Sequence, residues 1–138
     1  MRVIVDTSVW SMALRRQRKQ LSAPERAMVL QLRDLIVDGD AILLGSVRQE
    51  LLTGISDTGA FEMVRRRLEG FENLTPEIAD YERGAEYANQ CTRVGIATTT
   101  TDMLICAVAA ARELPILTTD GDFIHYARKL PIQLYPRS

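Results

Sequence analysis

Short, mostly apolar segments alternate along the chain with longer segments of helical character, and this alternation limits the possible folds most. The apolar segments predict strands at Val3–Val5, 41–46, 115–119 and 132–136. Strands this short and apolar bury both of their faces, which is typical of a mainly parallel sheet covered by helices on both sides. The sequence therefore predicts an α/β domain.

The segments between these strands carry helix signals. In residues 24–39, proline occupies the first turn, apolar residues recur at helical spacing, and glycine marks the end. Residues 75–95 begin with threonine, proline and glutamate, another helix-start pattern. The full set of predicted helices is 7–16, 24–39, 47–54, 57–70, 75–95, 98–114 and 123–129.

Length and composition predict one ordinary globular domain. The 138 residues, 46% of them hydrophobic, fit a single domain over 1–138 that buries roughly two-thirds of its unfolded surface. No apolar run approaches the ~20 residues of a membrane span, and the N-terminus lacks a secretion signal, so we expect a cytoplasmic protein without membrane contact. Cys91 and Cys106 lie in predicted helices and are expected to be buried free thiols.

The basic residues give a weak indication of phosphate binding. The net charge is −1, but of the 17 basic residues only Lys19 and Lys129 are not arginine. Two clusters stand out, at 15–19 and 65–67. The planar guanidinium suits phosphate, yet an ordinary solvated helix face explains either cluster equally well.

Polar residues follow three of the predicted strands. Asp6, Ser46 and Asp120 come at these ends, Glu50 lies one helical turn beyond Ser46, and Asp102 lies near the start of a helix. Sites in parallel sheets form beyond the carboxyl ends of the strands. Four carboxylates from four separate segments can therefore converge on one edge of the sheet.

Each acid also has a structural explanation. Asp6 can cap the following helix, and Asp102 can complement the dipole of its own helix, with Thr100 or Thr101 as the cap. Glu50 can be a solvated helix residue, which taken alone is the simpler explanation. Asp120 and Asp122 suit a tight turn, and we expect Asp122 to cap the helix that begins at 123. No structural reason, however, requires all four acids to share one edge.

A cluster of carboxylates is tolerated only when protons or cations neutralise it. Oxygen ligands without nearby histidine or cysteine favour Mg²⁺ or Mn²⁺, ions that activate water and contact phosphate oxygens. Ser8 is expected to orient Asp6, and Thr118 to act similarly beside Asp120. Nucleotide-binding glycine motifs are absent, and the single histidine, His125, excludes a pair of catalytic imidazoles.

Four segments resemble the acidic motifs of PIN-domain ribonucleases. They are VIVDTSVW, SVRQELLTG, TTTTDMLICAVA and ILTTDGDF, and their order and spacing are most similar to those of VapC-type toxins. The resemblance implies a three-layer α/β/α fold with four or five strands and Mg²⁺- or Mn²⁺-dependent endonucleolytic cleavage of RNA. It also implies a homodimer that is neutralised by a cognate VapB-type antitoxin.

The resemblance assigns roles by position. It implies that Asp6 and Asp102 bind the metal and that Glu50 and Asp120 complete the catalytic acids. It makes Thr118 the hydroxyl residue of the last motif.

Several interpretations remain open at this stage. Asp122 matches an acid found in only some family members, so its role stays open. Trp10, Met12 and Leu14 are candidate dimer contacts, although burial in the core is the more ordinary fate of such side chains. Two other functions are also open: a non-cleaving module that binds RNA or protein, and a PIN nuclease that acts on DNA.

Overall fold

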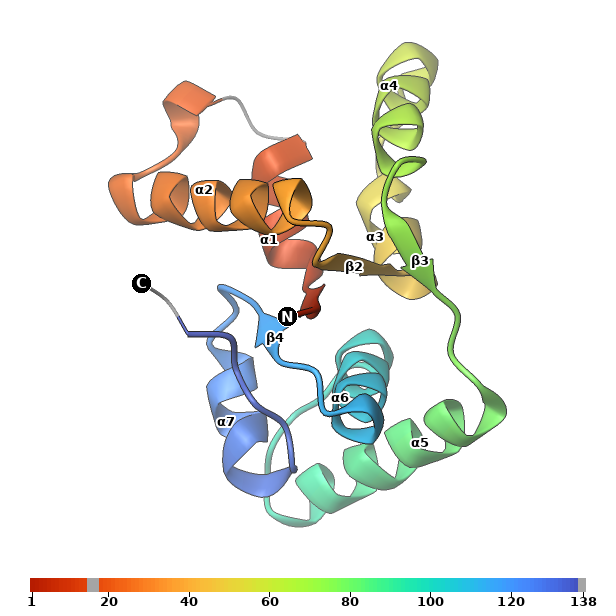
Figure 1. Ribbon diagram of the computed structural model, residues 1–138. Coiled ribbons are helices and arrows are strands. Elements are labelled where there is room, and N and C mark those ends of the chain that lie inside the picture. The colour runs from red at the N-terminus through yellow and green to blue at the C-terminus, as the bar shows by residue number, and fades with distance from the viewer. Residues whose placement is uncertain (15–17, 137–138) are drawn as a thin grey trace.

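A four-stranded parallel sheet forms the centre of the protein in a computed structural model, which describes residues 1–14 and 18–136 (Figure 1). The strand order is β3-β2-β1-β4, and every neighbouring pair is parallel. The strands are β1 Val3–Val5, β2 Ala41–Leu44, β3 Glu72–Leu74 and β4 Ile116–Leu117. The prediction of a mainly parallel sheet of four or five strands is confirmed.

Helices cover the sheet on two sides and complete the three-layer α/β/α architecture. In Figure 1, α1 and α2 lie on one side of the strands and α5, α6 and α7 on the other, while α4 packs on α3 and extends away from the body. The described α-helices are α1 Thr7–Leu14, α2 Ala23–Val37, α3 Gly45–Leu52, α4 Thr58–Leu68, α5 Ile78–Arg93, α6 Thr100–Arg112 and α7 Asp122–Lys129. A short 3₁₀ turn, Arg18–Gln20, precedes α2.

The core lies between the sheet and both helix layers. All three residues of β1 and all four of β2 are buried, as continuous apolar strands predict. Trp10 of α1 is fully buried and donates a hydrogen bond from its indole nitrogen to Val5 O at 3.1 Å. Met12 is buried as well, and Leu14 packs against the core, so these side chains contribute to the core of the protomer.

Two strand assignments differ from the sequence prediction. Strand β3 was not predicted, because Glu72 and Asn73 are exposed at the sheet edge and show no apolar pattern. The segment predicted as a strand at 132–136 lies beside β4, but among the described residues it forms an isolated parallel bridge, Leu134 to Ile116, and not a full strand. An edge segment needs only one neighbour for pairing, so burial patterns in the sequence say little about it.

A partly buried ion pair joins α5 and α6, which pack closely against each other. Arg112 of α6 donates to both carboxylate oxygens of Asp80 on α5, at 3.0 and 2.9 Å. The same Asp80 side chain accepts from the backbone of Glu77 at the start of α5. Hydrogen bonding to Arg112 is the main reason that the pKa of Asp80 lies below its usual range.

The cysteines and the lengths of the helices can be compared with the sequence predictions. Cys91 and Cys106 are both buried and free, as predicted. Among the described helices, none combines the length and the apolar character of a membrane span.

Candidate active site

The carboxyl ends of β1 and β4 bring two segments together that are more than a hundred residues apart in the sequence. Asp6 follows β1, and its backbone nitrogen donates to Leu117 O at 2.9 Å, which continues the pairing of the two strands. Thr118 follows β4 and is buried beside Asp6. Sites at this edge of a parallel sheet are a general consequence of the topology.

Asp6 is held by hydroxyl groups. Its side chain is only 4% exposed, and its Oδ2 atom accepts hydrogen bonds from Ser8 Oγ and Thr118 Oγ1, both at 2.8 Å. Burial raises the pKa of Asp6 above its usual range, while the hydrogen bonds from Thr118 and Ser8 oppose this shift. Ser8 therefore orients Asp6 as predicted, and Thr118 donates to Asp6 instead of to Asp120.

Asp102 lies in the first turn of α6. Thr99 caps this helix by accepting from the backbone nitrogen of Asp102, and the Asp102 carboxylate accepts from the hydroxyl of Tyr126 at 3.1 Å. Burial, followed by the negative charges of Asp6 and Asp120, raises the pKa of Asp102 to about 6. The position of Asp102 at the start of α6 therefore does not cancel the rise in its pKa.

Asp120 and Asp122 meet Asp102 at the start of α7. Carboxylate oxygens of these three residues lie within 4.8 Å of one another. The expectation that Asp122 caps the helix is wrong: Asp122 is the first helical residue, and its backbone nitrogen donates to Asp120 Oδ1 at 2.9 Å. Asp120 is fixed in turn through its own backbone nitrogen, which donates to Thr118 Oγ1 at 3.0 Å.

Glu50 is connected to the end of β1 through a hydrogen bond with Thr7. It is exposed on α3 and accepts a hydrogen bond from Thr7 Oγ1 at 2.6 Å. Thr7 directly follows Asp6, so this contact joins α3 to the end of β1. Glu50 does not belong to the close group of Asp102, Asp120 and Asp122. Asp6 is also outside that group, although it lies near enough to Asp102 for its charge to raise the pKa of Asp102.

The cluster has the chemistry of a site for a divalent cation. Within the described residues, none of the ion pairs engages Asp6, Asp102, Asp120 or Asp122. The donors to Asp6 are neutral hydroxyl and backbone groups, so its charge stays unbalanced when it is ionised. Several carboxylates at this spacing fit a Mg²⁺ or Mn²⁺ ion, which favours hard oxygen ligands. The residues present therefore fit the metal that the sequence predicts.

The sequence did not predict the roles of three residues near the cluster. Tyr126 donates to Asp102 from α7, and Thr7 donates to Glu50 across helices. Thr99 caps α6, whereas the sequence predicted Thr100 or Thr101 as the cap. Threonine before an apolar helix signals a cap, but no local rule identifies Tyr126, since its role depends on the packing of α7 near α6.

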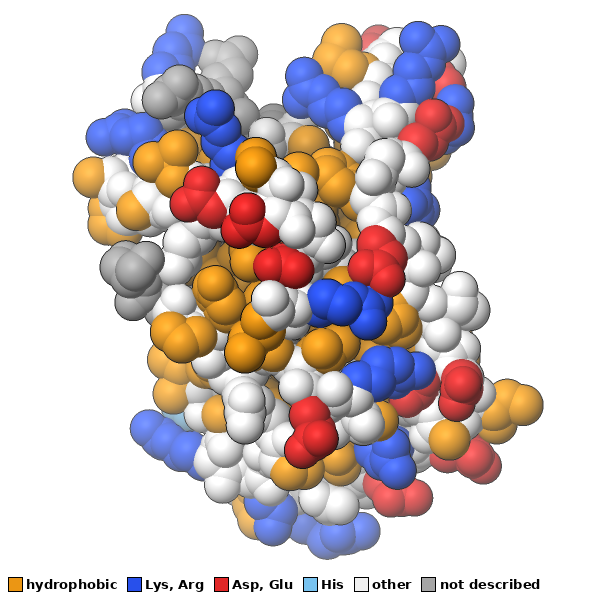
Figure 2. All heavy atoms as spheres, viewed as in Figure 1, with side chains coloured by type: hydrophobic (Ala, Val, Ile, Leu, Met, Phe, Trp, Pro, Cys, Tyr) orange, Lys and Arg blue, Asp and Glu red, His pale blue; other side chains and the backbone are white. Residues whose placement is uncertain are grey.

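The structure describes part of the first arginine cluster and all of the second. Residues 15–17 of the first cluster lie outside the described part of the chain, and Lys19 is exposed. In the second cluster, Arg65 pairs with Glu62 and Glu69, whereas Arg66 and Arg67 are exposed. Figure 2 shows basic side chains gathered over α4 at the upper right. Arg66 and Arg67 are therefore available to a ligand.

Comparisons with known proteins agree with this architecture. The PIN domain family matches residues 3–129 of the chain. FitAcB from Neisseria gonorrhoeae is similar in structure, with a TM-score of 0.73 and 21% identity over 98% of this chain and 97% of the other. VapBC2 from Rickettsia felis, solved with a DNA fragment from its promoter, gives a TM-score of 0.73 at 17% identity, covering 98% of each chain.

A third similar structure is DNA-bound VapBC from Salmonella typhimurium. It has a TM-score of 0.68 and 16% identity, over 98% of this chain and 97% of the other. At these identities the structural similarity establishes the fold. No curated protein sequence matches the chain significantly.

Proposed function

This chain belongs to the PIN domain family of nucleases, and from this premise we propose that it is a metal-dependent endoribonuclease. The observation that carries the proposal is the convergence of Asp6, Asp102 and Asp120 on one edge of the sheet. The pKa of Asp102 is raised by burial first and by the charges of the other two acids next. An arrangement that holds like charges together without a balancing side chain favours a bound cation.

The proposed roles follow from position. Asp6 and Asp102 hold a Mg²⁺ or Mn²⁺ ion, and Asp120 completes the ligand set directly or through water. Glu50, outside the close group, orients groups of the substrate or water. When bound, such an ion supplies charge stabilisation at a phosphate and lowers the pKa of a water molecule. Ser8 and Thr118 keep the Asp6 carboxylate in place through their hydrogen bonds.

RNA is the proposed substrate, and the toxin role is proposed from the comparisons. The structures named above are of FitAcB, VapBC2 and VapBC, and the latter two were solved with DNA. We therefore propose that residues 1–138 form a single PIN domain that acts in the cytoplasm as the toxin of a toxin–antitoxin pair. It would form a homodimer and be neutralised by a VapB-type antitoxin. Arg66 and Arg67 would contact the RNA backbone.

Cleavage of RNA with and without metal tests the proposal. We expect the purified protein to cut RNA with Mg²⁺ or Mn²⁺ and to lose this activity in a chelator. Asp6→Asn is expected to abolish cleavage, and because asparagine still accepts from Ser8 and Thr118, the fold should persist by circular dichroism. Asp120→Asn is a second variant with the same expectation. Glu82→Gln, on the exposed face of α5, is the control with full activity.

Three results would contradict the proposal. Full activity of Asp6→Asn and Asp120→Asn would exclude the acid cluster as the catalytic site. Binding of RNA without metal-dependent products would favour a non-cleaving module. Cleavage of single-stranded DNA in preference to RNA of the same sequence would assign the nuclease to DNA.

A further inference from the structure

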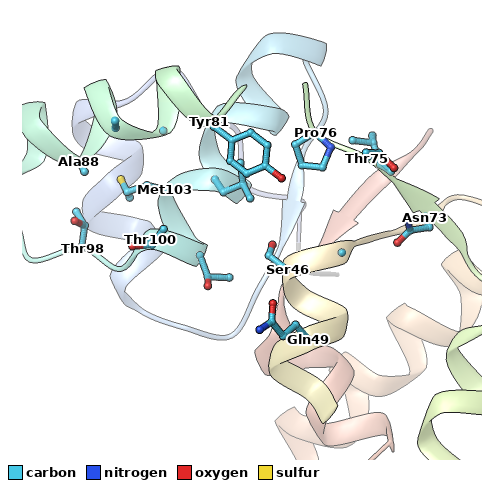
Figure 3. A pocket seen from close by; sticks show the side chains of 16 residues that line it. Ser46, Gln49, Asn73, Thr75, Pro76, Tyr81, Ala88, Thr98, Thr100 and Met103 are labelled. Carbon is cyan, nitrogen blue, oxygen red and sulfur yellow. The ribbon is translucent and has the colours of Figure 1, made fainter. Parts of the chain in front are cut away.

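A large pocket opens beside the acid cluster, between α3 and the β3–α5 connection on one side and α5 and α6 on the other (Figure 3). We call it the neutral pocket. Its volume is about 720 Å³, within the range of sites that hold small organic groups. Helix α5 and the first turn of α6 form its second wall.

None of the described residues that line the neutral pocket is charged. The polar part of its lining consists of hydroxyl and amide groups, and the remainder is apolar. Figure 3 shows the Tyr81 hydroxyl and the Gln49 side chain directed into the open space from opposite walls. The polar side chains include Ser46, Gln49, Asn73, Tyr81, Thr100 and Thr101.

One buried polar atom in this wall lacks a partner. Ser46 Oγ is shielded from solvent and forms no hydrogen bond among the described residues. A buried hydroxyl without a partner is unfavourable and rare in folded proteins. Ser46 lies in the wall of the neutral pocket, so a change of its side-chain rotamer would turn this hydroxyl toward a ligand there.

The neutral pocket adjoins two of the proposed catalytic residues in the chain. Thr101 of its lining directly precedes Asp102, and Gln49 directly precedes Glu50. Consecutive Cα atoms are about 3.8 Å apart, so the wall of the pocket begins beside the acids. A group that enters the pocket while a phosphate lies at the acids can therefore belong to the same or to a neighbouring nucleotide.

We infer that the neutral pocket binds one unstacked nucleobase of the RNA strand, next to the phosphate that is cut. The inference rests on the proposed function and adds a determinant of cleavage sequence. A base is flat, neutral and edged with donors and acceptors, which matches an uncharged lining with amide and hydroxyl groups. Proteins read single-stranded RNA by stacking bases on aromatic rings and by hydrogen bonds to base edges. Tyr81 supplies the ring, while Gln49, Asn73 and Ser46 supply the polar contacts.

Cleavage of a pool of short single-stranded RNAs of randomised sequence tests the inference. The wild type is expected to prefer one base at a fixed position beside the cut. Gln49→Ala and Ser46→Ala should weaken this preference roughly tenfold at that position only, because each removes a contact to the base edge. Tyr81→Ala should raise KM about tenfold for all sequences through lost stacking, and Tyr81→Phe should restore it. Gln133→Ala, exposed and outside the pocket, is the matched control.

A binding measurement separates this inference from the proposed function. RNAs carrying a fluorescent base analogue at successive positions are titrated with the Asp6→Asn protein, in which cleavage is blocked. A change in fluorescence at one position, lost in the additional Tyr81→Ala variant, supports the base pocket even if the wild type cuts no RNA. The absence of any position-specific change, or unchanged base preference in both Gln49→Ala and Ser46→Ala, overturns it.

The pocket can also be covered by a second copy of the chain. In that case Tyr81→Ala would convert a dimer into a monomer, measured by light scattering, and would reduce cleavage equally at all sequences. Base preference would then stay unchanged in Gln49→Ala. That combination would assign the neutral pocket to subunit contact and overturn the inference.

Discussion

Replacing Asp102 by asparagine should stabilise the metal-free protein while it removes a ligand of the proposed ion. Burial and the charges of Asp6 and Asp120 raise the pKa of Asp102 from 3.8 to about 6. A carboxyl group whose pKa is higher in the folded state binds its proton more tightly there than in the unfolded chain. The free energy of unfolding therefore falls as the pH rises from about 3.8 to about 6, and it stays low above that.

The magnitude follows from the size of this shift. Two pKa units correspond to about 3 kcal/mol if the group is fully shielded. Asp102 is partly exposed, and solvent screening reduces the expected contribution to about 1–2 kcal/mol. The asparagine side chain has no charge to desolvate, and its oxygen can still accept from Tyr126. Asp102→Asn should thus unfold at a free energy about 1–2 kcal/mol higher than the wild type at neutral pH in a chelator.

Urea denaturation followed by circular dichroism measures this difference. Wild type and Asp102→Asn are compared in chelator at pH 7.5 and near pH 4, where the gap should shrink because the wild-type carboxyl is largely protonated. Added Mg²⁺ should stabilise the wild type through binding to the native state and leave Asp102→Asn nearly unchanged. Glu82→Gln should match the wild type within about 0.5 kcal/mol. A variant no more stable than the wild type at pH 7.5 would refute the argument that burial and the neighbouring acids disfavour the ionised Asp102 carboxylate without metal.

Three further outcomes are expected. Arg112→Met should lower the free energy of unfolding by about 3 kcal/mol, seen in urea, because it leaves the buried Asp80 carboxylate without its partner; a loss below about 1 kcal/mol would contradict this. Tyr126→Phe should shift the pH–rate profile for cleavage to higher pH, since the hydroxyl stabilises the ionised carboxylate of Asp102. An unchanged profile would show that this hydrogen bond does not affect the protonation of Asp102 during cleavage. Arg66→Ala combined with Arg67→Ala should weaken RNA binding at all sequences and reduce the slope of log affinity against log salt by about 1.4, whereas an unchanged slope would remove both arginines from the interface.

Much of the fold follows from local patterns in the sequence. The buried strands at Val3–Val5 and Ala41–Leu44 are continuous apolar runs, and the helix around Met28 combines an apolar face with clear end signals. These features depend on residues that are close in the sequence, so the sequence alone predicts them. Strand β3 is different, because two of its three residues, Glu72 and Asn73, are polar and exposed, and it pairs with β2. Pairing across the sheet leaves no periodic pattern in an exposed edge strand.

In the candidate site, too, some features follow from the sequence and others depend on the three-dimensional structure. Asp6 and Asp120 follow strands, and parallel topology brings such ends together, so they could be predicted. The hydrogen-bond partners could not all be predicted: Thr118 contacts the Asp120 backbone, but its hydroxyl donates to the carboxylate of Asp6 and not to that of Asp120. Adjacent residues in a chain do not determine which neighbouring strand their side chains face. That choice depends on the pairing of β1 with β4, which only the three-dimensional structure shows.

The ends of the strands do not by themselves fix all the carboxylates of the cluster, and Tyr126 supplies a further restraint. Asp102 comes from a helix rather than from a strand, so the sheet alone does not fix its carboxylate. Tyr126, on the neighbouring helix α7, provides that restraint through a hydrogen bond, and its ring packs edge-to-face against Phe123 in the core. The same helix begins beside Asp120, so α7 orients two of the acids at once. A change that shifts α7 should therefore disturb Asp102 and Asp120 together, while Asp6, held by Ser8 and Thr118, keeps its place.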